Sequence, residues 1–369
     1  MSAPLDASKL EITKTTKPSE PLPKEELVFG KSFTDHILEV EWTAEKGWGV
    51  PTIKPYHNFS LDPATCVLHY SFELFEGLKA YRDSNGKIRT FRPDKNMERM
   101  NRSAKRAALP TFDGEEFIKL VDQFLLIEER FVPTGYGYSL YLRPTLIGTS
   151  IGLGVNAPTK ALLYLIASPV GPYFSGGFKP VSLEATDYAV RAWPKGVGSY
   201  KLGANYVSCI EPQMEAAKRG HSQNLWLFGE EGYITEVGAM NVFFAFKNAD
   251  GTKELVTPPL DGMILPGVTR DSTLELAKSK LPSDWTVNER KLTIHEVKER
   301  AAKGELVEAF GTGTAAIVSP IDNIEFQGEQ IKVPVSAGSS GEIALKINDW
   351  IKAIQYGDES FKNWSRVAQ

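Results

Sequence analysis

The chain has 369 residues, 42% of them hydrophobic and 24% charged, and its formal net charge is -4. This charge gives no broad basic surface for nucleic acid, and no apolar run approaches the roughly 20 residues that cross a bilayer. Two cysteines, Cys66 and Cys209, are too few for a disulfide framework, and their separation fits no metal site. We therefore expect a reducing compartment, the cytoplasm, with the mitochondrial matrix as the alternative for a processed chain.

The length exceeds that of a usual single core, so two domains are predicted. Residues 1–27 are polar and rich in lysine, proline, serine and threonine, which predicts a poorly ordered arm. A small α/β domain is expected over 28–168 and a larger domain, carrying Lys201, over 179–369. The linker over 169–178 is predicted from its glycines and prolines and from the absence of periodicity.

The first domain is predicted to combine short strands with two helices. Asn85-Gly86 ends a hairpin turn signal. Pro93 is placed to open a helix, and Asp113 is placed to cap the next one. The predicted elements are strands over 79–82, 87–91, 138–147 and 161–167, a helix from 93, and a helix over 114–131.

The second domain is predicted to be another mixed layer of strands and helices. Gly220 is expected to end one helix, and Ser272-Thr273-Leu274-Glu275 reads as a capping box that opens another. The predicted strands cover 181–184, 224–228, 233–236, 241–246, 306–310 and 315–318, and the predicted helices cover 205–219, 272–281, 295–303 and 343–354.

One lysine, Lys201, stands in a loop of glycines and aromatics that runs from Gly196 to Tyr206. Glycines allow tight turns and close approach of a ligand. A lysine that such a loop turns inward loses hydration, so its pKa falls and its amine becomes a nucleophile. This is the environment of a Schiff base to an aldehyde cofactor, and an ordinary surface lysine is the alternative for the loop taken alone.

Other residues carry weaker signals. The turns at 265–270 and 311–315 could present backbone N–H groups to an anion, although most such turns are only turns. Glu236 at a strand end is either a salt-bridge partner or a functional acid, and Arg99 carries the opposite ambiguity. Arg143 lies in an apolar strand, where an anionic partner is plausible for a guanidinium.

Several motif classes are absent from the sequence. His295-Glu296 does not continue to the zinc pattern H-E-x-x-H. There is no G-x-G-x-x-G between a strand and a helix, no P-loop and no G-x-S-x-G elbow. Zinc proteases, nucleotide-binding enzymes and serine hydrolases of these types are therefore disfavoured, as is a nicotinamide dehydrogenase.

Taken together, six segments resemble the branched-chain amino acid aminotransferases, most closely the fungal type, which are fold type IV pyridoxal-phosphate enzymes. The similarity covers nearly the whole chain after the arm. It implies a mixed α/β fold of two domains and reversible, ping-pong transamination of L-leucine, L-isoleucine and L-valine with 2-oxoglutarate. The segments are Phe33-Thr34-Asp35-His36, Leu74-Phe75-Glu76-Gly77, Tyr200-Lys201-Leu202-Gly203, Thr235-Glu236-Val237-Gly238, Leu265-Pro266-Gly267-Val268 and Gly313-Thr314-Ala315.

The resemblance implies pyridoxal 5'-phosphate as cofactor and Lys201 as the catalytic residue. Lys201 would bond to the cofactor aldehyde and later move the substrate proton. Glu236 would pair with the pyridine nitrogen and keep it protonated, so that the ring acts as an electron sink. Tyr206 would contact the phenolic oxygen, and Arg191 would lie near the cofactor. The implied phosphate ligands are Arg99, the N–H groups of Val268 and Thr269, and Thr312.

The resemblance also implies a pocket that accepts both an apolar amino acid and glutamate. Arg143, helped by the Tyr70 hydroxyl, would receive the glutamate side-chain carboxylate, and the N–H groups of Thr314 and Ala315 would bind the α-carboxylate. Tyr70 and Val155 would lie in the active site of the partner subunit, which implies a homodimer. The complete implied substrate set is Phe29, Tyr70, Phe75, Tyr141, Arg143, Val155, Tyr173, Thr314 and Ala315, with Tyr173 covering the pocket.

The chain departs from its relatives at two places. Ala239 stands where many relatives have threonine, which removes one hydroxyl near the cofactor. Ala316 and Ser319 occupy the positions of a C-x-x-C in mammalian relatives, so that redox switch is absent here. D-amino acid aminotransferases and aminodeoxychorismate lyases share the lysine and the glutamate, but Arg143 in its Tyr-Leu-Arg-Pro setting argues against both.

Overall fold

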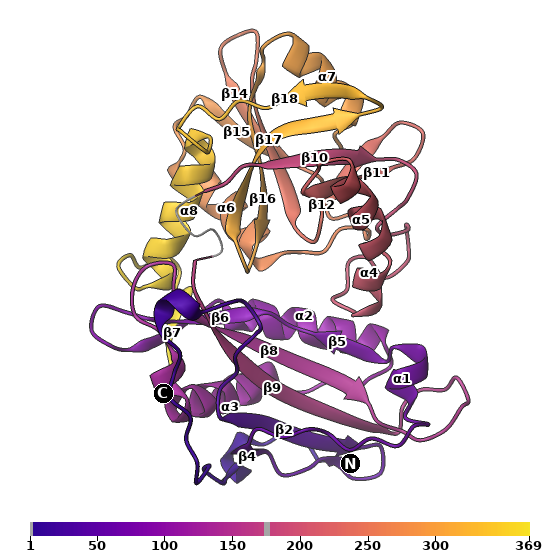
Figure 1. Cartoon of the computed structure of the whole chain (residues 1–369), viewed down its shortest axis with the longest axis vertical. Coiled ribbons are helices and arrows are strands. Elements are labelled where there is room, and N and C mark those ends of the chain that lie inside the picture. The colour runs from indigo at the N-terminus through magenta and orange to yellow at the C-terminus, as the bar shows by residue number, and fades with distance from the viewer. Residues whose placement is uncertain (1–2, 173–177) are drawn as a thin grey trace. The chain divides into compact units, whose positions relative to one another are not determined.

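The computed structural model describes residues 3–172 and 178–369, which form two compact units (Figure 1). Unit 1 comprises residues 3–172, 200–204 and 353–369, and unit 2 comprises 178–199 and 205–352. The stretch that carries Lys201 thus groups with unit 1, where a place in the second domain was expected. Residues 173–177 of the predicted linker lie outside the described residues, and its start belongs to a strand that ends at Val170.

Unit 1 is built on a ten-stranded sheet with the order β1-β4-β2-β9-β8-β6-β7-β19, in which β3 pairs with β2 and β5 with β8. β8 and β9 pair antiparallel along their length, from Ser139 opposite Val170 to Gly148 opposite Ala161. The strands are β1 (Glu11–Ile12), β2 (His36–Thr43), β3 (Gly47–Trp48), β4 (Thr52–Pro55), β5 (Glu73–Phe75), β6 (Leu78–Arg82), β7 (Ile88–Phe91), β8 (Ser139–Gly148), β9 (Lys160–Val170) and β19 (Ser365–Val367).

Both ends of the chain join this sheet. β1 pairs in parallel with β4, and β19 pairs antiparallel with β7. The Thr15 N–H also donates to Nε2 of the buried His36, at 2.8 Å. The prediction of a poorly ordered arm over 1–27 is therefore corrected for these residues, because the arm finds backbone partners far along the sequence. The last residues likewise belong to unit 1 and not to the second domain.

The helices of unit 1 are α1 (Cys66–Tyr70), α2 (Pro93–Arg106) and α3 (Gly114–Ile127), with short 3₁₀ turns at Ala7–Lys9, Lys24–Glu26 and Glu129–Phe131. Two predicted starts are confirmed: Pro93 is the first residue of α2, and the Asp113 carboxylate accepts from the Glu115 N–H at 2.9 Å. α2 buries polar side chains beside its methionines, namely Asn96, Arg99 and Ser103. This buried polar face becomes important for the site.

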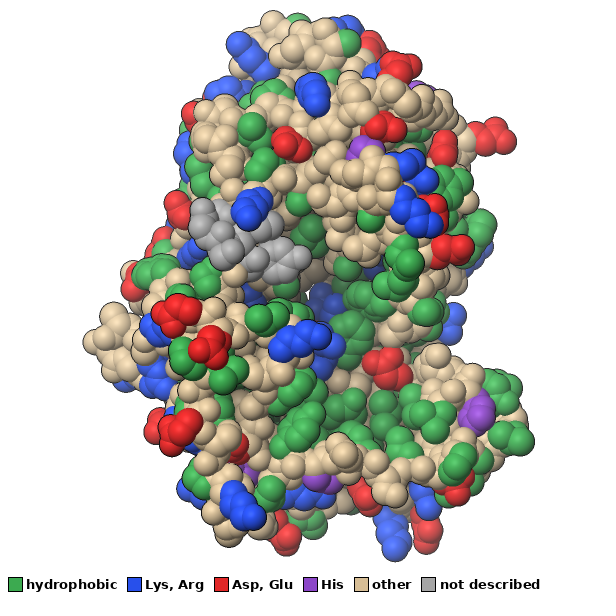
Figure 2. Space-filling view, viewed as in Figure 1, with side chains coloured by type: hydrophobic (Ala, Val, Ile, Leu, Met, Phe, Trp, Pro, Cys, Tyr) green, Lys and Arg blue, Asp and Glu red, His purple; other side chains and the backbone are tan. Residues whose placement is uncertain are grey.

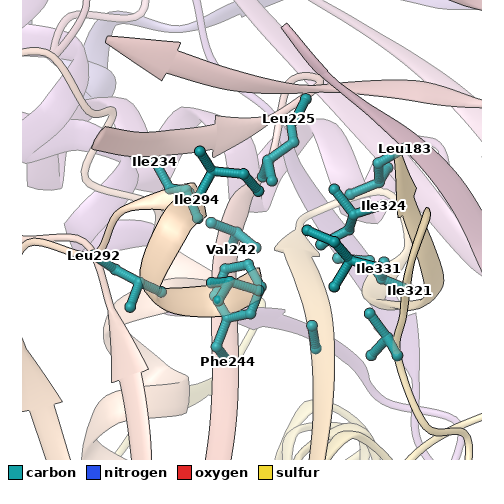
Figure 3. Packing of buried hydrophobic residues seen from close by; sticks show 14 of the residues in the cluster. Leu183, Leu225, Ile234, Val242, Phe244, Leu292, Ile294, Ile321, Ile324 and Ile331 are labelled. Carbon is teal, nitrogen blue, oxygen red and sulfur yellow. The ribbon is translucent and has the colours of Figure 1, made fainter. Parts of the chain in front are cut away.

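Unit 2 is built on a nine-stranded sheet with the order β12-β11-β10-β17-β16-β13-β14-β15, with β18 paired to β17. Its strands are β10 (Val181–Thr186), β11 (Gln223–Phe228), β12 (Tyr233–Val237), β13 (Asn241–Lys247), β14 (Lys253–Thr257), β15 (Trp285–Glu289), β16 (Leu306–Gly313), β17 (Ile317–Phe326) and β18 (Glu329–Lys332). Aliphatic and aromatic residues of these strands and of α7 (Ile294–Ala302) form a continuous core, including Leu225, Val242, Phe244, Ile294 and Ile324 (Figure 3).

Two predicted helices of unit 2 are corrected. Ser272 does not cap α6 (Val268–Lys280), because the helix begins a turn earlier, after Gly267, and the Ser272 hydroxyl donates to the Val268 carbonyl at 2.8 Å. The helix expected over 205–219 is divided into α4 (Ala204–Val207) and α5 (Ile210–Lys218). Pro212 lies in the first turn of α5, where a proline is tolerated, and its ring disfavours a continuous helix through that point.

The strand expected over 315–318 begins only at Ile317 and continues to Phe326, because residues 314–316 form the turn after β16. Most other predicted elements occur close to their expected positions. The hairpins β6–β7 and β11–β12 are both antiparallel, and the final helix is α8 (Glu342–Gln355). Over the described part of the chain, no helix combines the length and the apolar character needed to cross a membrane.

Candidate active site

Lys201 is held by its backbone against two elements of unit 1. Its N–H donates to the Ser103 hydroxyl on α2 at 2.9 Å, and its carbonyl accepts from the Phe75 N–H on β5 at 3.2 Å. Leu202 forms an isolated bridge with Leu74. A Cβ at Gly203 would come within 1.8 Å of the Glu73 carboxylate, so a larger residue there would displace that side chain. Gly203 therefore packs closely against the Glu73 side chain of β5.

The Lys201 amine lies in surroundings that disfavour its charged form. Its Nζ lies 4.7 Å from the centroid of the Phe75 ring. The pKa of the amine is lowered to about 8, mainly by burial and next by the charge of Arg99, while the carboxylate of Glu76 acts in the opposite direction. A substantial fraction of the amine is therefore neutral and nucleophilic near physiological pH. The surface-lysine alternative does not describe this side chain.

Arg99 is held by a buried acid, Glu76, which belongs to the segment Leu74-Phe75-Glu76-Gly77 but for which the sequence predicted no role. Its Nε and one terminal nitrogen each donate to a carboxylate oxygen of Glu76 at 2.8 Å. Asn96, one helical turn earlier on α2, donates to the same carboxylate at 2.7 Å. Arg99 and Glu76 are both buried. This two-point pairing fixes the plane of the guanidinium.

Aromatic rings surround a second cation in unit 1, Arg143 on β8. A terminal nitrogen of Arg143 donates to the Tyr141 hydroxyl at 2.9 Å, and its guanidinium carbon lies 4.6 Å from the Phe75 ring centroid. Phe29 packs edge-on against Tyr141, with their centroids 4.8 Å apart. The Arg143 Nε is buried and has no hydrogen-bond partner among the described residues. This group offers an apolar wall with one positive charge.

Tyr70 and Val155 belong to another part of unit 1. Tyr70 ends α1, and its hydroxyl donates to the Leu153 carbonyl in the loop between β8 and β9. Its expected role beside Arg143 concerns the active site of a partner subunit and stays a prediction. Val155 lies in the same loop and is 71% exposed. Tyr173, the expected cover of the pocket, lies outside the described residues.

In unit 2, Glu236 near the end of β12 is buried and held by several donors. It forms an ion pair with Arg191 and accepts at Oε1 from the Asn241 side chain at 3.1 Å and from the Leu265 N–H at 3.0 Å. Arg191 is itself buried and donates to the carbonyls of Gly198 and Met263. Glu236 is thus a salt-bridge partner, and its carboxylate is fixed in orientation.

The two predicted anion turns lie close to this acid in unit 2. Asn241 also donates to the Leu265 carbonyl at 2.8 Å and pairs with Thr312 across β13 and β16. Val268 and Thr269 are the first residues of α6, where N–H groups and the helix dipole favour an anion. The Thr312 hydroxyl is buried, and within the described residues it has no hydrogen-bond partner.

These observations fit the phosphate and ring of pyridoxal 5'-phosphate. A helix start and an unpartnered buried hydroxyl suit a phosphate, and a carboxylate suits a protonated ring nitrogen. Tyr206 on α4, and Thr314 and Ala315 in the turn after β16, are half-buried. In the part of the chain that the structure describes, no cluster of three or more histidine, cysteine or acidic side chains could hold a metal ion.

Four supporting residues were missed by sequence reasoning: Glu76, Asn96, Ser103 and Asn241. A signal existed for two of them, because Asn96 and Ser103 share a helical face with Arg99 at a spacing of three and four residues. Polar residues on the same face as buried methionines indicate partners in the interior. Glu76 gave no such signal, since its partner Arg99 is 23 residues away, and Asn241 gave none because Glu236, although five residues away, lies on a different strand.

Comparison with known proteins adds three likenesses. The sequence model of the family described as amino-transferase class IV matches residues 73–324. The chain is 62% identical to the cytosolic branched-chain-amino-acid aminotransferase of Saccharomyces cerevisiae, over 99% of this chain and 98% of that protein. It is also 62% identical to the mitochondrial enzyme of the same organism, over 99% of this chain and 94% of that one.

A solved structure is similar in fold. It is the branched-chain amino acid aminotransferase from Thermobaculum terrenum in its PLP form, which matches with a TM-score of 0.70 at 22% identity and covers 89% of this chain and 98% of that chain. This likeness confirms the mixed α/β fold that the sequence motifs predicted.

Proposed function

We propose that this chain reversibly transfers an amino group between L-leucine, L-isoleucine or L-valine and 2-oxoglutarate. The chain belongs to the class IV aminotransferases and, within them, to the branched-chain-amino-acid aminotransferases. The products are the branched 2-oxo acids and L-glutamate. The observation that carries this proposal is the Lys201 amine, whose pKa is lowered to about 8 by burial within the motif that resembles the family.

The proposed cofactor is pyridoxal 5'-phosphate, which supplies, when bound, a ring that withdraws electrons from the substrate Cα. Lys201 Nζ would hold the cofactor through its aldehyde, with loss of water, and, once the substrate amine had displaced it, would move the proton of the substrate Cα. Glu236, oriented by Arg191 and Asn241, holds the proton of the ring nitrogen. The phosphate ligands in this proposal are Arg99, Thr312 and the N–H groups of Val268 and Thr269, and Tyr206 contacts the phenolic oxygen.

For the substrates, the apolar wall and the charge of unit 1 have separate tasks. Phe29, Phe75 and Tyr141 accept a branched side chain through apolar contact. Arg143, already oriented by the Tyr141 hydroxyl, receives the side-chain carboxylate of glutamate. The N–H groups of Thr314 and Ala315 bind the α-carboxylate of either substrate, and Tyr173 covers the pocket.

We further propose a homodimer, supported by an exposed apolar patch on unit 1. The patch consists of Leu68, Ile151, Leu153 and Val155, which are 59%, 65%, 68% and 71% exposed. Hydrophobic side chains gather over α1 in the space-filling view (Figure 2). Such a patch on a surface marks an interaction site. A second copy covers it in this proposal and receives Tyr70 and Val155 into its active site.

Light scattering during gel filtration tests the dimer. The wild-type chain should have twice the mass of the monomer, and Leu153→Glu should shift it towards a monomer because a charge would enter the contact. A wild-type monomer at micromolar concentration would contradict the proposal.

For the location we propose the cytoplasm, with the mitochondrial matrix as the alternative, and fractionation of cells followed by detection with an antibody decides between them.

An absorption spectrum tests the reaction itself. Protein loaded with pyridoxal 5'-phosphate should show a visible band that L-leucine converts to a near-ultraviolet band and that 2-oxoglutarate restores. Absence of a visible band in the loaded protein would contradict the cofactor assignment. A band that responds to D-alanine but not to L-leucine would instead support a D-amino acid aminotransferase and contradict the substrate assignment.

A further inference from the structure

The reaction proposed above requires the Lys201 amine to stay in one place, and this inference rests on that proposed function. We propose that Ser103 is a positioning residue for Lys201: its hydroxyl anchors the backbone of the lysine to α2 and so keeps the amine beside Arg99 and Phe75. Ser103 does not touch the reacting atoms in this proposal.

The anchor is a single hydrogen bond between remote parts of the sequence. The Lys201 N–H donates to Ser103 Oγ at 2.9 Å, and Ser103 is completely buried. A buried backbone N–H needs a partner, because water cannot reach it. The lysine carbonyl is held separately by the Phe75 N–H. Together α2 and β5 hold the lysine backbone from both of its polar groups.

Cation–π contacts also attach Tyr200, the residue before the lysine, to α2. The ring of Tyr200 lies under the guanidinium groups of Arg102 and Arg106, whose carbons are 5.6 and 5.9 Å from its centroid. Arg102 and Ser103 are neighbours on α2, and Arg106 lies one turn later. Residues 200 and 201 are therefore both fixed to one turn of one helix.

Packing alone does not explain why residue 103 is a serine. Serine is a weaker helix former than alanine, and its hydroxyl competes with the helix backbone. The residues beside it on the buried face are Met100 and Ala104. Alanine would suit this face better if only packing mattered. The hydroxyl has one evident task, which is to accept the Lys201 N–H.

The same helix fixes the electrostatic neighbour of the amine. Arg99 lies four residues before Ser103, so the two side chains stack on one face of α2. Glu76 and Asn96 hold the guanidinium of Arg99 in place. Because Ser103 ties Lys201 to that face, loss of the tie lets the amine move relative to Arg99 and towards water. This movement would weaken the causes that lower the pKa of the amine.

The test compares Ser103→Ala with Ser139→Ala. Ser139 is also buried in unit 1, and its hydroxyl has no partner among the described residues, so its removal controls for loss of a buried hydroxyl. The first readout is hydrogen exchange of the peptide that contains residues 199–203, followed by mass spectrometry. We expect exchange at the Lys201 amide to become about tenfold faster in Ser103→Ala, and unchanged in Ser139→Ala.

The second readout is the pH dependence with which an acylating reagent modifies Lys201 in the cofactor-free chain. Its midpoint should rise from about 8 towards the ordinary lysine value of 10.5 in Ser103→Ala only. The third readout is the single-turnover rate with L-leucine, which should fall about tenfold or more in the loaded enzyme without loss of bound cofactor. A merely structural role would change the unfolding temperature and the exchange of the Lys201 amide, but it would leave the acylation midpoint of the Lys201 amine unchanged.

Ser103→Ala with the same exchange, midpoint and rate as Ser139→Ala would overturn the proposal. If Ser103→Ala does not fold, Ser103→Cys replaces it, because sulfur is only a weak acceptor; the same changes are expected in smaller size, and their absence overturns the proposal equally. A wild-type enzyme without transamination would contradict the proposed function alone, since exchange and acylation do not depend on it.

Discussion

The surroundings of Lys201 and Glu236 differ in how they prepare a charged side chain for chemistry. The Lys201 amine lies beside an aromatic ring and near two arginines, so its charged form is disfavoured. The Glu236 carboxylate lies among donors: Arg191, Asn241 and a backbone N–H. Desolvation thus makes the Lys201 amine reactive, whereas directed hydrogen bonds give the Glu236 carboxylate a fixed orientation.

The largest expected effect comes from removing the amine itself. Lys201→Ala should abolish measurable turnover, because the proposed function assigns both the bond to the cofactor aldehyde and the proton transfer to this amine. The backbone contacts of residue 201 do not require the side chain, so the fold should survive. Steady-state assays with L-leucine and 2-oxoglutarate measure turnover, and circular dichroism checks the fold. Turnover near the wild-type value would contradict the role of Lys201.

The second largest effect is expected when the carboxylate of Glu236 is replaced. Glu236→Gln should lower kcat by on the order of 10²–10³, the usual loss on removal of one electrostatic stabiliser. Glu308→Gln is a matched control, because Glu308 is a buried carboxylate of unit 2 that accepts from the N–H groups of Ile343 and Ala344. The control should lower the free energy of unfolding but leave kcat intact. Equal kcat values for both variants would contradict the electron-sink assignment.

A smaller and more selective effect is expected at Arg143. Arg143→Ala should slow the glutamate half-reaction by about tenfold or more, because it removes the charged partner of the side-chain carboxylate. The leucine half-reaction should change less, since leucine presents only an apolar side chain there. Single-turnover measurements of each half-reaction separate the two. Arg89→Ala, which removes an arginine paired with Asp83 elsewhere in unit 1, is the control.

The smallest expected effect is on the free energy of unfolding, and its pH dependence reports the pKa of the Lys201 amine in the folded chain. The pKa of Lys201 is lowered to about 8 in the folded chain, against 10.5 for an ordinary lysine. Below pH 8 the buried amine is protonated and lowers the free energy of unfolding by its full amount, and this penalty disappears as the pH rises from 8 to 10.5. Lys201→Met should therefore stabilise the cofactor-free chain at neutral pH, and this advantage should shrink between pH 8 and 10.5. Urea unfolding at several pH values measures it. An advantage independent of pH would assign the effect to packing alone.

Much of the fold could be predicted because its signals are local. Pro93 and Asp113 begin their helices as expected, and the β6–β7 hairpin follows the turn signal that ends at Asn85-Gly86. Two of the errors have long-range causes. The arm and the C-terminal strand find sheet partners that no local pattern announces. The start of α6 is a local error, because the helix already begins after Gly267, one turn before the expected capping box.

The candidate site divides in the same way. Lys201, Arg143 and Glu236 could be named from motifs, whereas the glycine-rich loop alone left open whether Lys201 is turned inward or lies on the surface. The residues that hold them could not, because a hydrogen bond such as that between Ser103 and Lys201 joins positions 98 residues apart. Glu76 was visible in a motif, but only the structure shows that its carboxylate orients Arg99.

The central claim is that Lys201 carries an amine made reactive by its surroundings. Its most direct test is the pH dependence of acylation of Lys201 in the cofactor-free wild-type chain, followed residue by residue by mass spectrometry, with the exposed Lys303 as an internal reference. Our account predicts half-maximal reactivity of Lys201 near pH 8, well below that of Lys303. A midpoint at the ordinary lysine value of 10.5 would contradict it.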